Sequence, residues 1–196
     1  MYYIPQLLYN NFIKLFESIT PDISIQRDPQ SSIEDFTHQQ PLNITPIVES
    51  ILSTGLIYSE TIIKRLAYSL MAKPFVILSG LAGSGKTQLA LAFAKCLSEN
   101  EDNKFDKQIC TVSIGADWTN REPLLGYPNA LKNDEYVLPE SGVLQLLMRA
   151  NKNQDKPYFL ILDEMNLSVV ERYFADFLSA MESGEPIKLW DNESEA

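Results

Sequence analysis

The sequence has few of the residues that build disulfide frameworks or zinc sites. It contains two cysteines, Cys96 and Cys110, which lie in apolar surroundings without a CxxC pair, and a single histidine, His38. Disulfide frameworks and zinc sites need several such side chains at characteristic spacings. The sequence therefore supports neither kind of site and indicates a reduced, intracellular protein.

Basic residues are also scarce, because 16 lysines and arginines stand against 26 aspartates and glutamates, which gives a net charge of −10. Non-specific affinity for DNA comes from basic side chains that neutralise phosphates, so we expect this chain alone to bind DNA poorly. No apolar run reaches the roughly 18 residues of a membrane span. The start of the chain also lacks a basic segment followed by an apolar one. We expect a cytoplasmic protein with no membrane contact.

What is present is an ordinary globular composition, with 45% hydrophobic and 21% charged residues over 196 positions. This length accommodates one domain and an appendage. Apolar residues recur at helical spacing over residues 3–19, whereas residues 21–46 show no sustained period. We therefore divide the chain into an N-terminal helical extension and linker at residues 1–55 and a core at residues 56–196.

Helical and extended patterns alternate through the core. Helices are predicted at residues 59–70, 86–97, 143–148 and 168–181, and strands at residues 75–78, 108–114 and 158–162. The runs at 75–78 and 158–162 are short and continuously apolar, which is typical of strands buried on both faces of a parallel sheet. The alternation predicts an α/β fold whose sheet has helices on both faces.

The strongest motif lies between the predicted strand at residues 75–78 and the helix at residues 86–97. Its residues are Gly80, Leu81, Ala82, Gly83, Ser84, Gly85, Lys86 and Thr87. They fit the phosphate-binding pattern G-x-x-x-x-G-K-[ST] at every fixed position. Such a loop points backbone N–H groups at phosphates, beside the positive end of the following helix. We expect Lys86 to reach the β and γ phosphates and the Thr87 hydroxyl to bind Mg²⁺.

Two acidic residues, Asp163 and Glu164, directly follow the apolar run at residues 158–162. A carboxylate at the carboxyl end of a buried strand lies where open α/β sheets bind ligands, so Asp163 is positioned to hold Mg²⁺ through its water shell. Glu164 is then placed to orient and deprotonate an attacking water. Taken alone, such a pair more often just ends a strand. Together with the complete phosphate loop, it favours hydrolysis over phosphoryl transfer to a metabolite.

These two motifs and their surroundings give the sequence a resemblance to the AAA+ NTPases and, within them, to the McrB-like branch of modified-cytosine restriction systems. Besides the phosphate loop, residues 116–127 (ADWTNREPLLGY) and residues 162–178, which begin LDEMNLS, carry this resemblance. It covers roughly residues 56–190. The two longer segments are more specific than the phosphate loop, which many unrelated proteins share.

The resemblance implies a P-loop NTPase fold, a three-layer αβα sandwich that forms the large subdomain of an AAA+ module. It implies Mg²⁺-dependent hydrolysis of ATP or GTP, with Lys86 on the phosphates, Glu164 as catalytic base, and Thr87 and Asp163 serving Mg²⁺. Neighbouring subunits of such proteins assemble into a ring. The implied role is a motor component of a DNA restriction or defence complex, with a nuclease or effector subunit as partner and DNA reached only through the assembly.

Residues Ile57 and Tyr58 lie just before the predicted helix at residues 59–70, where proteins of this family commonly contact the base of the nucleotide. The alternative is a hydrophobic staple that fixes the start of that helix. The sequence does not separate these two interpretations, and it does not separate ATP from GTP.

The sequence departs from the family after Glu164, because only 32 residues follow it. The family's sensor strand, arginine finger and helical lid come later than that. We therefore expect the front part of an AAA+ module, which would form a ring only when completed by the missing half and would turn over nucleotide slowly by itself. The alternative function is a catalytically silent nucleotide-binding or scaffold fragment.

Overall fold

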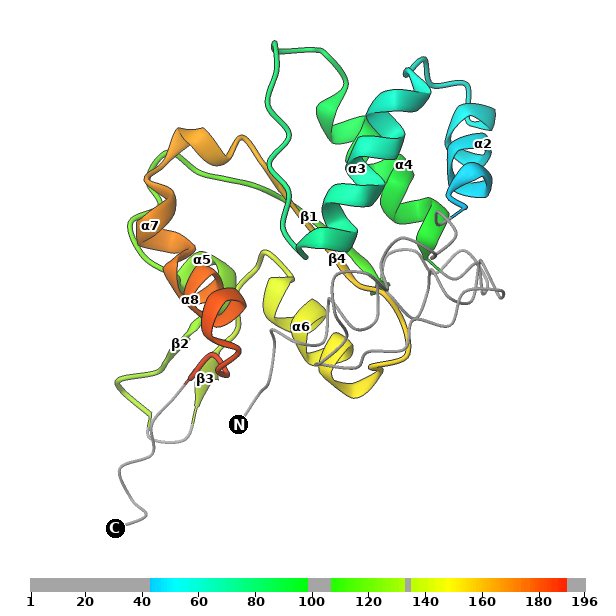
Figure 1. Ribbon diagram of the computed structural model, residues 1–196. Coiled ribbons are helices and arrows are strands. Elements are labelled where there is room, and N and C mark those ends of the chain that lie inside the picture. Colours follow the sequence, from blue (N-terminus) through cyan, green and yellow to red (C-terminus); the bar gives the residue numbers. More distant parts are fainter. Residues whose placement is uncertain (1–42, 99–106, 133–134, 190–196) are drawn as a thin grey trace.

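The computed structural model describes residues 43–98, 107–132 and 135–189 (Figure 1). Its elements are α2 (Thr45–Ser53), α3 (Glu60–Ala72), α4 (Lys86–Leu97), β1 (Ile109–Ser113), α5 (Glu122–Leu125), β2 (Tyr127–Pro128), β3 (Tyr136–Val137), α6 (Val143–Lys152), β4 (Phe159–Asp163), the 3-10 turn η3 (Met165–Leu167), α7 (Val170–Tyr173) and α8 (Ala175–Ser183). The predicted helix at residues 3–19 and most of the predicted linker lie outside the described residues, as does His38. Within those ranges, no helix combines the length and the apolar character that crossing a bilayer requires.

The centre of the structure is a parallel pair of strands, β1 and β4. Ile109 pairs with Phe159 at one end and Ser113 with Asp163 at the other. The contact continues one residue further, because the Ile114 amide donates to the Asp163 carbonyl at 3.0 Å. A parallel pair joined through intervening helices confirms the predicted mixed α/β organisation. β2 and β3 form a separate, short antiparallel pair.

The two faces of the β1–β4 pair contribute to different hydrophobic clusters, since successive side chains of a strand point to opposite faces. Phe159 packs against the first cluster. Leu160 and Leu162 of β4, with Cys110 and Val112 of β1, pack in the second. Helices therefore lie on both faces of the pair, as Figure 1 shows for α4 and α6.

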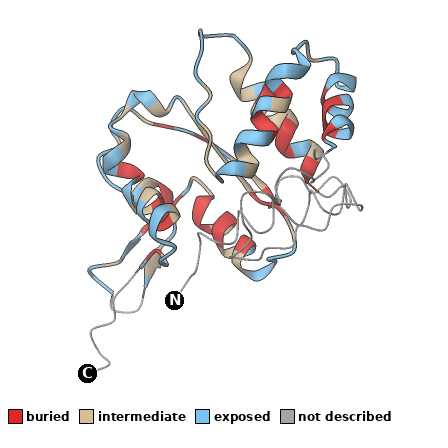
Figure 2. Ribbon diagram, in the orientation of Figure 1, coloured by how far each residue is buried: buried red, intermediate tan, exposed pale blue. Residues whose placement is uncertain are grey.

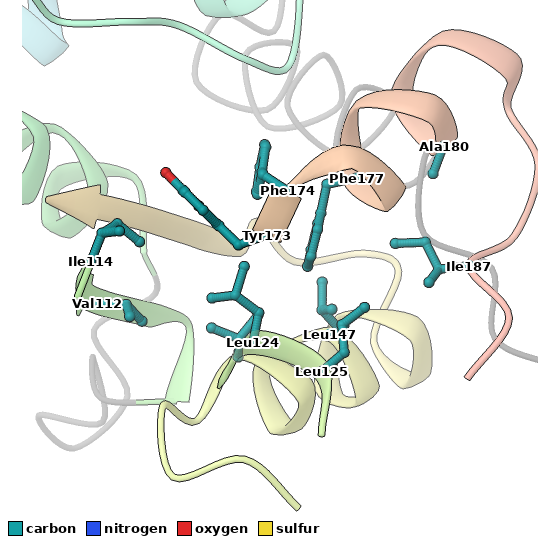
Figure 3. Close-up of a cluster of buried hydrophobic side chains, with 11 residues drawn as sticks. Val112, Ile114, Leu124, Leu125, Leu147, Tyr173, Phe174, Phe177, Ala180 and Ile187 are labelled. Carbon is teal, nitrogen blue, oxygen red and sulfur yellow. The ribbon is translucent and has the colours of Figure 1, made fainter. Parts of the chain in front are cut away.

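The first cluster joins α2, α3 and α4, and Figure 2 shows buried segments in each of these helices. Its buried residues are Ile44, Ile47, Val48, Ile51, Ile63, Leu66, Ala67, Leu89, Phe93 and Leu97. The second cluster joins α5, α6, α7 and α8 to the strands. In Figure 3, the aromatic side chains of Tyr173, Phe174 and Phe177 lie above those of Leu124, Leu125 and Leu147.

Two predicted helices of the core form where the sequence places them. α4 spans Lys86–Leu97, the predicted bounds. α3 begins after Ser59, whose hydroxyl accepts a hydrogen bond from the Ile62 amide at 3.4 Å, and it ends before Pro74. Both ends follow from local chemistry, because serine caps a helix start and proline disfavours helix in the residue before it.

The prediction of a strand at residues 75–78 is wrong, because this segment forms no strand within the described part of the chain. It was also expected to be buried on both faces, yet Ile77 is 70% exposed. A strand needs a neighbour that completes its backbone hydrogen bonds. The described sheets pair only β1 with β4 and β2 with β3, so this apolar run has no described partner strand.

The prediction of one continuous helix at residues 168–181 is also wrong, because the structure has two helices there, α7 and α8, which are divided at Phe174. Phe174 has φ −117° and ψ 2°, outside the helical region. The break lets two consecutive aromatic residues enter the second cluster. Tyr173 meets Trp118 edge to face at 5.7 Å, and Phe174 stacks on Phe177 at 4.7 Å.

The sequence analysis assigned no helix to residues 45–53, where the structure has α2. Pro46 lies at the start of this helix, a position that proline tolerates because its missing N–H would have no intrahelical acceptor there. Ile47, Val48 and Ile51 are buried, so α2 belongs to the first cluster with α3 and α4. The helix lies before the predicted division at residue 55, and that division remains a prediction.

The packing of α2 predicts that two substitutions of equal size at adjacent positions have very different effects on the free energy of unfolding. Ile51 is 0% exposed and Leu52 is 36% exposed. Ile51→Ala should lower the free energy of unfolding by about 2–5 kcal/mol, because it leaves a cavity in the first cluster. Leu52→Ala should change it by about 0.5 kcal/mol or less. Urea unfolding of the two variants measures this, and equal losses would show that α2 does not pack as described.

Candidate phosphate and metal site

The predicted phosphate loop, residues 80–87, connects the apolar segment at 75–78 to the start of α4. Gly83 and Gly85 have φ of 74° and 83°, a conformation that residues with a side chain rarely adopt. Gly85 is also the N-cap of α4 and has no side chain to occupy the helix end. The first amides of a helix lack intrahelical acceptors, so the loop presents N–H groups at a helix N-terminus.

Lys86 folds back across this loop. Its Nζ donates to the Gly80 carbonyl at 3.1 Å and to the Leu81 carbonyl at 2.8 Å. The ammonium group is therefore held over the loop by two backbone acceptors. A phosphate oxygen that replaced those carbonyls would gain a charge-assisted hydrogen bond.

The structure brings Thr87 and Asp163 together although they are 76 positions apart. The Thr87 hydroxyl donates to Asp163 Oδ1 at 3.1 Å. Thr87 lies in the first turn of α4, and Asp163 is the last residue of β4. The end of the predicted metal-binding strand therefore meets the end of the predicted phosphate loop.

These two oxygen atoms fit the needs of Mg²⁺. The ion prefers oxygen ligands, and in nucleotide sites it commonly takes one or two from the protein and the rest from phosphates and water. Within the described ranges there is no group of three or more acidic, cysteine or histidine side chains that could hold a metal by itself. The donor set at Thr87 and Asp163 therefore suits an ion that arrives with a phosphate ligand.

Glu164 has an unusual backbone conformation. Among the described residues other than glycine, it alone has a positive φ, of 56°. Its amide donates to Asp163 Oδ1 at 3.1 Å, and its carbonyl accepts from the Leu167 amide at 3.0 Å. A left-handed conformation costs a residue with a side chain on the order of 1–2 kcal/mol, and such residues cluster at functional sites. The Glu164 side chain is exposed, next to Asp163.

The segment after Glu164 is held by residues that the sequence analysis did not assign to the site. The Ser168 hydroxyl donates to the Trp118 carbonyl. The Tyr173 hydroxyl donates to the Met165 carbonyl at 3.1 Å. Burial raises the pKa of Tyr173, with a smaller contribution from Glu171, so the phenol stays a protonated donor. No local pattern in the sequence indicates these contacts.

Cys110 of β1 also has a shifted pKa. Burial raises the pKa of this thiol, against a smaller lowering by Arg149, and its Sγ donates to the Ser141 carbonyl at 3.2 Å. A thiol with a raised pKa is a poor nucleophile. Cys110 therefore acts as a core residue.

A cavity of about 720 Å³ lies beside the phosphate loop. Residues 74–80 and residues 157–166 both line it, together with Lys86 and Thr87. Both the apolar segment at 75–78 and β4 therefore border this space. No arginine is among the described residues that line it.

Ile57 and Tyr58 differ in their surroundings. Ile57 is 99% exposed, so it has no part in a staple. Tyr58 packs against the first cluster, which includes Ile63 of α3, in keeping with the staple interpretation. Its hydroxyl also donates to the Gly85 carbonyl at 2.8 Å, a contact that the sequence analysis did not predict. A contact with a nucleotide base remains a prediction for both residues.

No family model matches the chain, and no solved structure matches it. The chain is similar to a restriction-enzyme subunit. It is 24% identical over 190 residues to the type IV methyl-directed restriction enzyme EcoKMcrB subunit of Escherichia coli (strain K12). The match covers 93% of this chain and 38% of that subunit, so the chain spans well under half of its relative's length. At this identity, the match gives weak support to a McrB-like relationship.

Proposed function

We propose that this chain binds and hydrolyses a nucleoside triphosphate, ATP or GTP, together with Mg²⁺. The observation that carries the proposal is the 3.1 Å contact between the Thr87 hydroxyl and the Asp163 carboxylate. It joins a glycine-rich loop at a helix N-terminus to a strand-end acid, and both are needed for a phosphate chain with a bound metal ion. The proposed fold is that of a P-loop NTPase of the AAA+ class.

In this proposal, the loop and Lys86 bind the phosphates. The N–H groups at the start of α4 donate to phosphate oxygens, and the helix dipole favours their negative charge. Lys86 Nζ, which now bonds to the carbonyls of Gly80 and Leu81, donates instead to the β and γ phosphates. Binding therefore exchanges two neutral acceptors for charged ones.

Thr87 and Asp163 would hold Mg²⁺, which neutralises the charge that develops on the transferred phosphate. Glu164 lies next to Asp163 with its side chain exposed, where it can accept the proton of a water that attacks the γ phosphate. Its strained backbone is maintained by the hydrogen bonds to Asp163 and Leu167.

The similar subunit of Escherichia coli supports a proposal for the kind of complex in which this activity takes place. Its name describes a subunit of a methyl-directed restriction enzyme. We propose that this chain is a motor component of a McrB-like DNA restriction or defence complex in the cytoplasm, acting in a ring with a nuclease or effector subunit. A net charge of −10 argues that DNA is reached through the assembly rather than by this chain alone.

A second candidate is a nucleotide-binding scaffold that does not hydrolyse. The observation in its favour is the cavity, whose described lining contains no arginine. An arginine that stabilises the transition state typically contributes about 10³–10⁵ in rate. Hydrolysis by this chain then depends on an arginine from elsewhere.

The binding step is tested by replacing Lys86. Lys86→Ala should weaken the binding of Mg²⁺-ATP and Mg²⁺-GTP by about tenfold or more, because a charge-assisted contact with phosphate is lost. Lys95→Ala, in the last turn of the same helix, is the matched control and should bind as the wild type does. Calorimetric titration with each nucleotide measures both constants and the preferred base. Equal affinities for the two variants would contradict the proposal.

The hydrolysis step is tested by replacing Glu164. Glu164→Gln should keep wild-type nucleotide affinity and lower single-turnover conversion of the bound nucleotide by about 10²-fold or more, because the general base is lost. Glu171→Gln, an exposed glutamate of α7, is the control and should not change the rate. Wild-type turnover in Glu164→Gln would refute the base assignment. Tight binding without any conversion in the wild type would favour the scaffold.

A further inference from the structure

Tyr58 makes a contact that links the start of α3 to the last residue of the phosphate loop before α4. Its hydroxyl donates to the Gly85 carbonyl at 2.8 Å, across 27 positions of the chain. The ring fills the space beside that residue, because a Cβ at Gly85 would lie 2.6 Å from the Tyr58 hydroxyl oxygen. Tyr58, just before α3, therefore contacts the phosphate loop at Gly85.

The support of Tyr58 is rigid. It directly precedes Ser59, the N-cap of α3, and its ring packs against the first cluster. Within that cluster, Ile63 of α3 and Phe93 of α4 are 0% and 1% exposed. The hydroxyl is thus held in place by the same packing that joins α3 to α4.

The carbonyl that Tyr58 binds has a second role. It also accepts the first intrahelical hydrogen bond of α4, from the Leu89 amide at 2.9 Å. A trans peptide is planar, and its C=O and N–H point in opposite directions. Holding the Gly85 carbonyl toward Tyr58 and Leu89 therefore points the Lys86 amide the other way, out of the helix end.

We propose that Tyr58 is a positioning residue that fixes the orientation of the peptide between Gly85 and Lys86, and with it an amide that donates to phosphate. The inference rests on the proposed nucleotide binding. Gly85 has φ 83° and no side chain, so its backbone has more freedom than any other residue type would allow. The tyrosine removes that freedom before a ligand arrives, which lowers the entropic cost of binding.

This role is distinct from contact with a nucleotide base. A base contact acts only on ligands that carry a base, whereas an oriented amide acts on any ligand that carries the phosphate chain. Inorganic tripolyphosphate with Mg²⁺ is therefore the informative probe, because it has the phosphates and lacks the base.

The experiment compares Tyr58→Phe with Tyr68→Phe and the wild type by titration with Mg²⁺-tripolyphosphate, Mg²⁺-ATP and Mg²⁺-GTP. Tyr58→Phe keeps the ring and removes the hydroxyl. Tyr68 is a 47% exposed tyrosine of α3 and provides the matched control. We expect Tyr58→Phe to bind tripolyphosphate and the preferred nucleotide about fivefold more weakly, because the peptide must then be ordered when the ligand binds. Tyr68→Phe should bind as the wild type does.

The other outcomes separate this inference from the proposed function. A wild type that binds nucleotide, with unchanged tripolyphosphate affinity in Tyr58→Phe, overturns the inference alone. A loss confined to the nucleotides also overturns it, in favour of a base contact. A wild type that binds none of the three ligands overturns the proposed function, and the inference with it.

Amide exchange in the unliganded chain gives a test that needs no ligand. In Tyr58→Phe, the Leu89 amide should exchange several-fold faster, because its acceptor, the Gly85 carbonyl, is freed to rotate. The Phe93 amide, one turn later in α4, should exchange at the wild-type rate. Equal acceleration of both amides would mean that Tyr58 only stabilises the fold, and would overturn the positioning role.

Discussion

The candidate site depends on one meeting point, where the carboxyl end of β4 reaches the amino end of α4. The Thr87 hydroxyl and the Asp163 carboxylate are 3.1 Å apart there. The first cluster maintains this approach, since Leu89 of α4 and Phe159 of β4 both pack in it. The parallel register then places Ser113 beside Asp163, so both strands end at the same edge. The proposed binding of phosphate and that of Mg²⁺ both depend on this packing.

The loop is better supported from the helical side than from the side of the strand. α4, Lys86 and Tyr58 hold it through hydrogen bonds to Gly80, Leu81 and Gly85. The segment at 75–78, by contrast, pairs with no described strand, and one of its apolar side chains, that of Ile77, is largely exposed. The described hydrogen bonds of the loop thus come mainly from α4 and from Tyr58, just before α3.

How much the sequence could predict follows the range of the interactions. α4, the capped start of α3, and β1 and β4 were predictable, because helical propensity, Ser59 and short runs rich in strand-forming residues are local signals. The approach of Thr87 to Asp163 was predictable only through the two motifs taken together. The failure at 75–78 was not, since the same run forms a strand or not according to a distant partner. The contacts of Tyr58, Ser168 and Tyr173 with backbone carbonyls were equally invisible, because any residue supplies a carbonyl.

The central claim is that Thr87 and Asp163 serve one metal ion. The most direct measurement is a double-mutant cycle of nucleotide affinity with Thr87→Val, Asp163→Asn and the double variant, in Mg²⁺ and in a chelator. If both side chains act on one ion, each single change should weaken binding in Mg²⁺. The double variant should then bind nucleotide only slightly less tightly than the single variant with the lower affinity. The coupling free energy between the two positions should vanish in the chelator. Losses that add in Mg²⁺, or that are the same with and without the metal, would contradict the account.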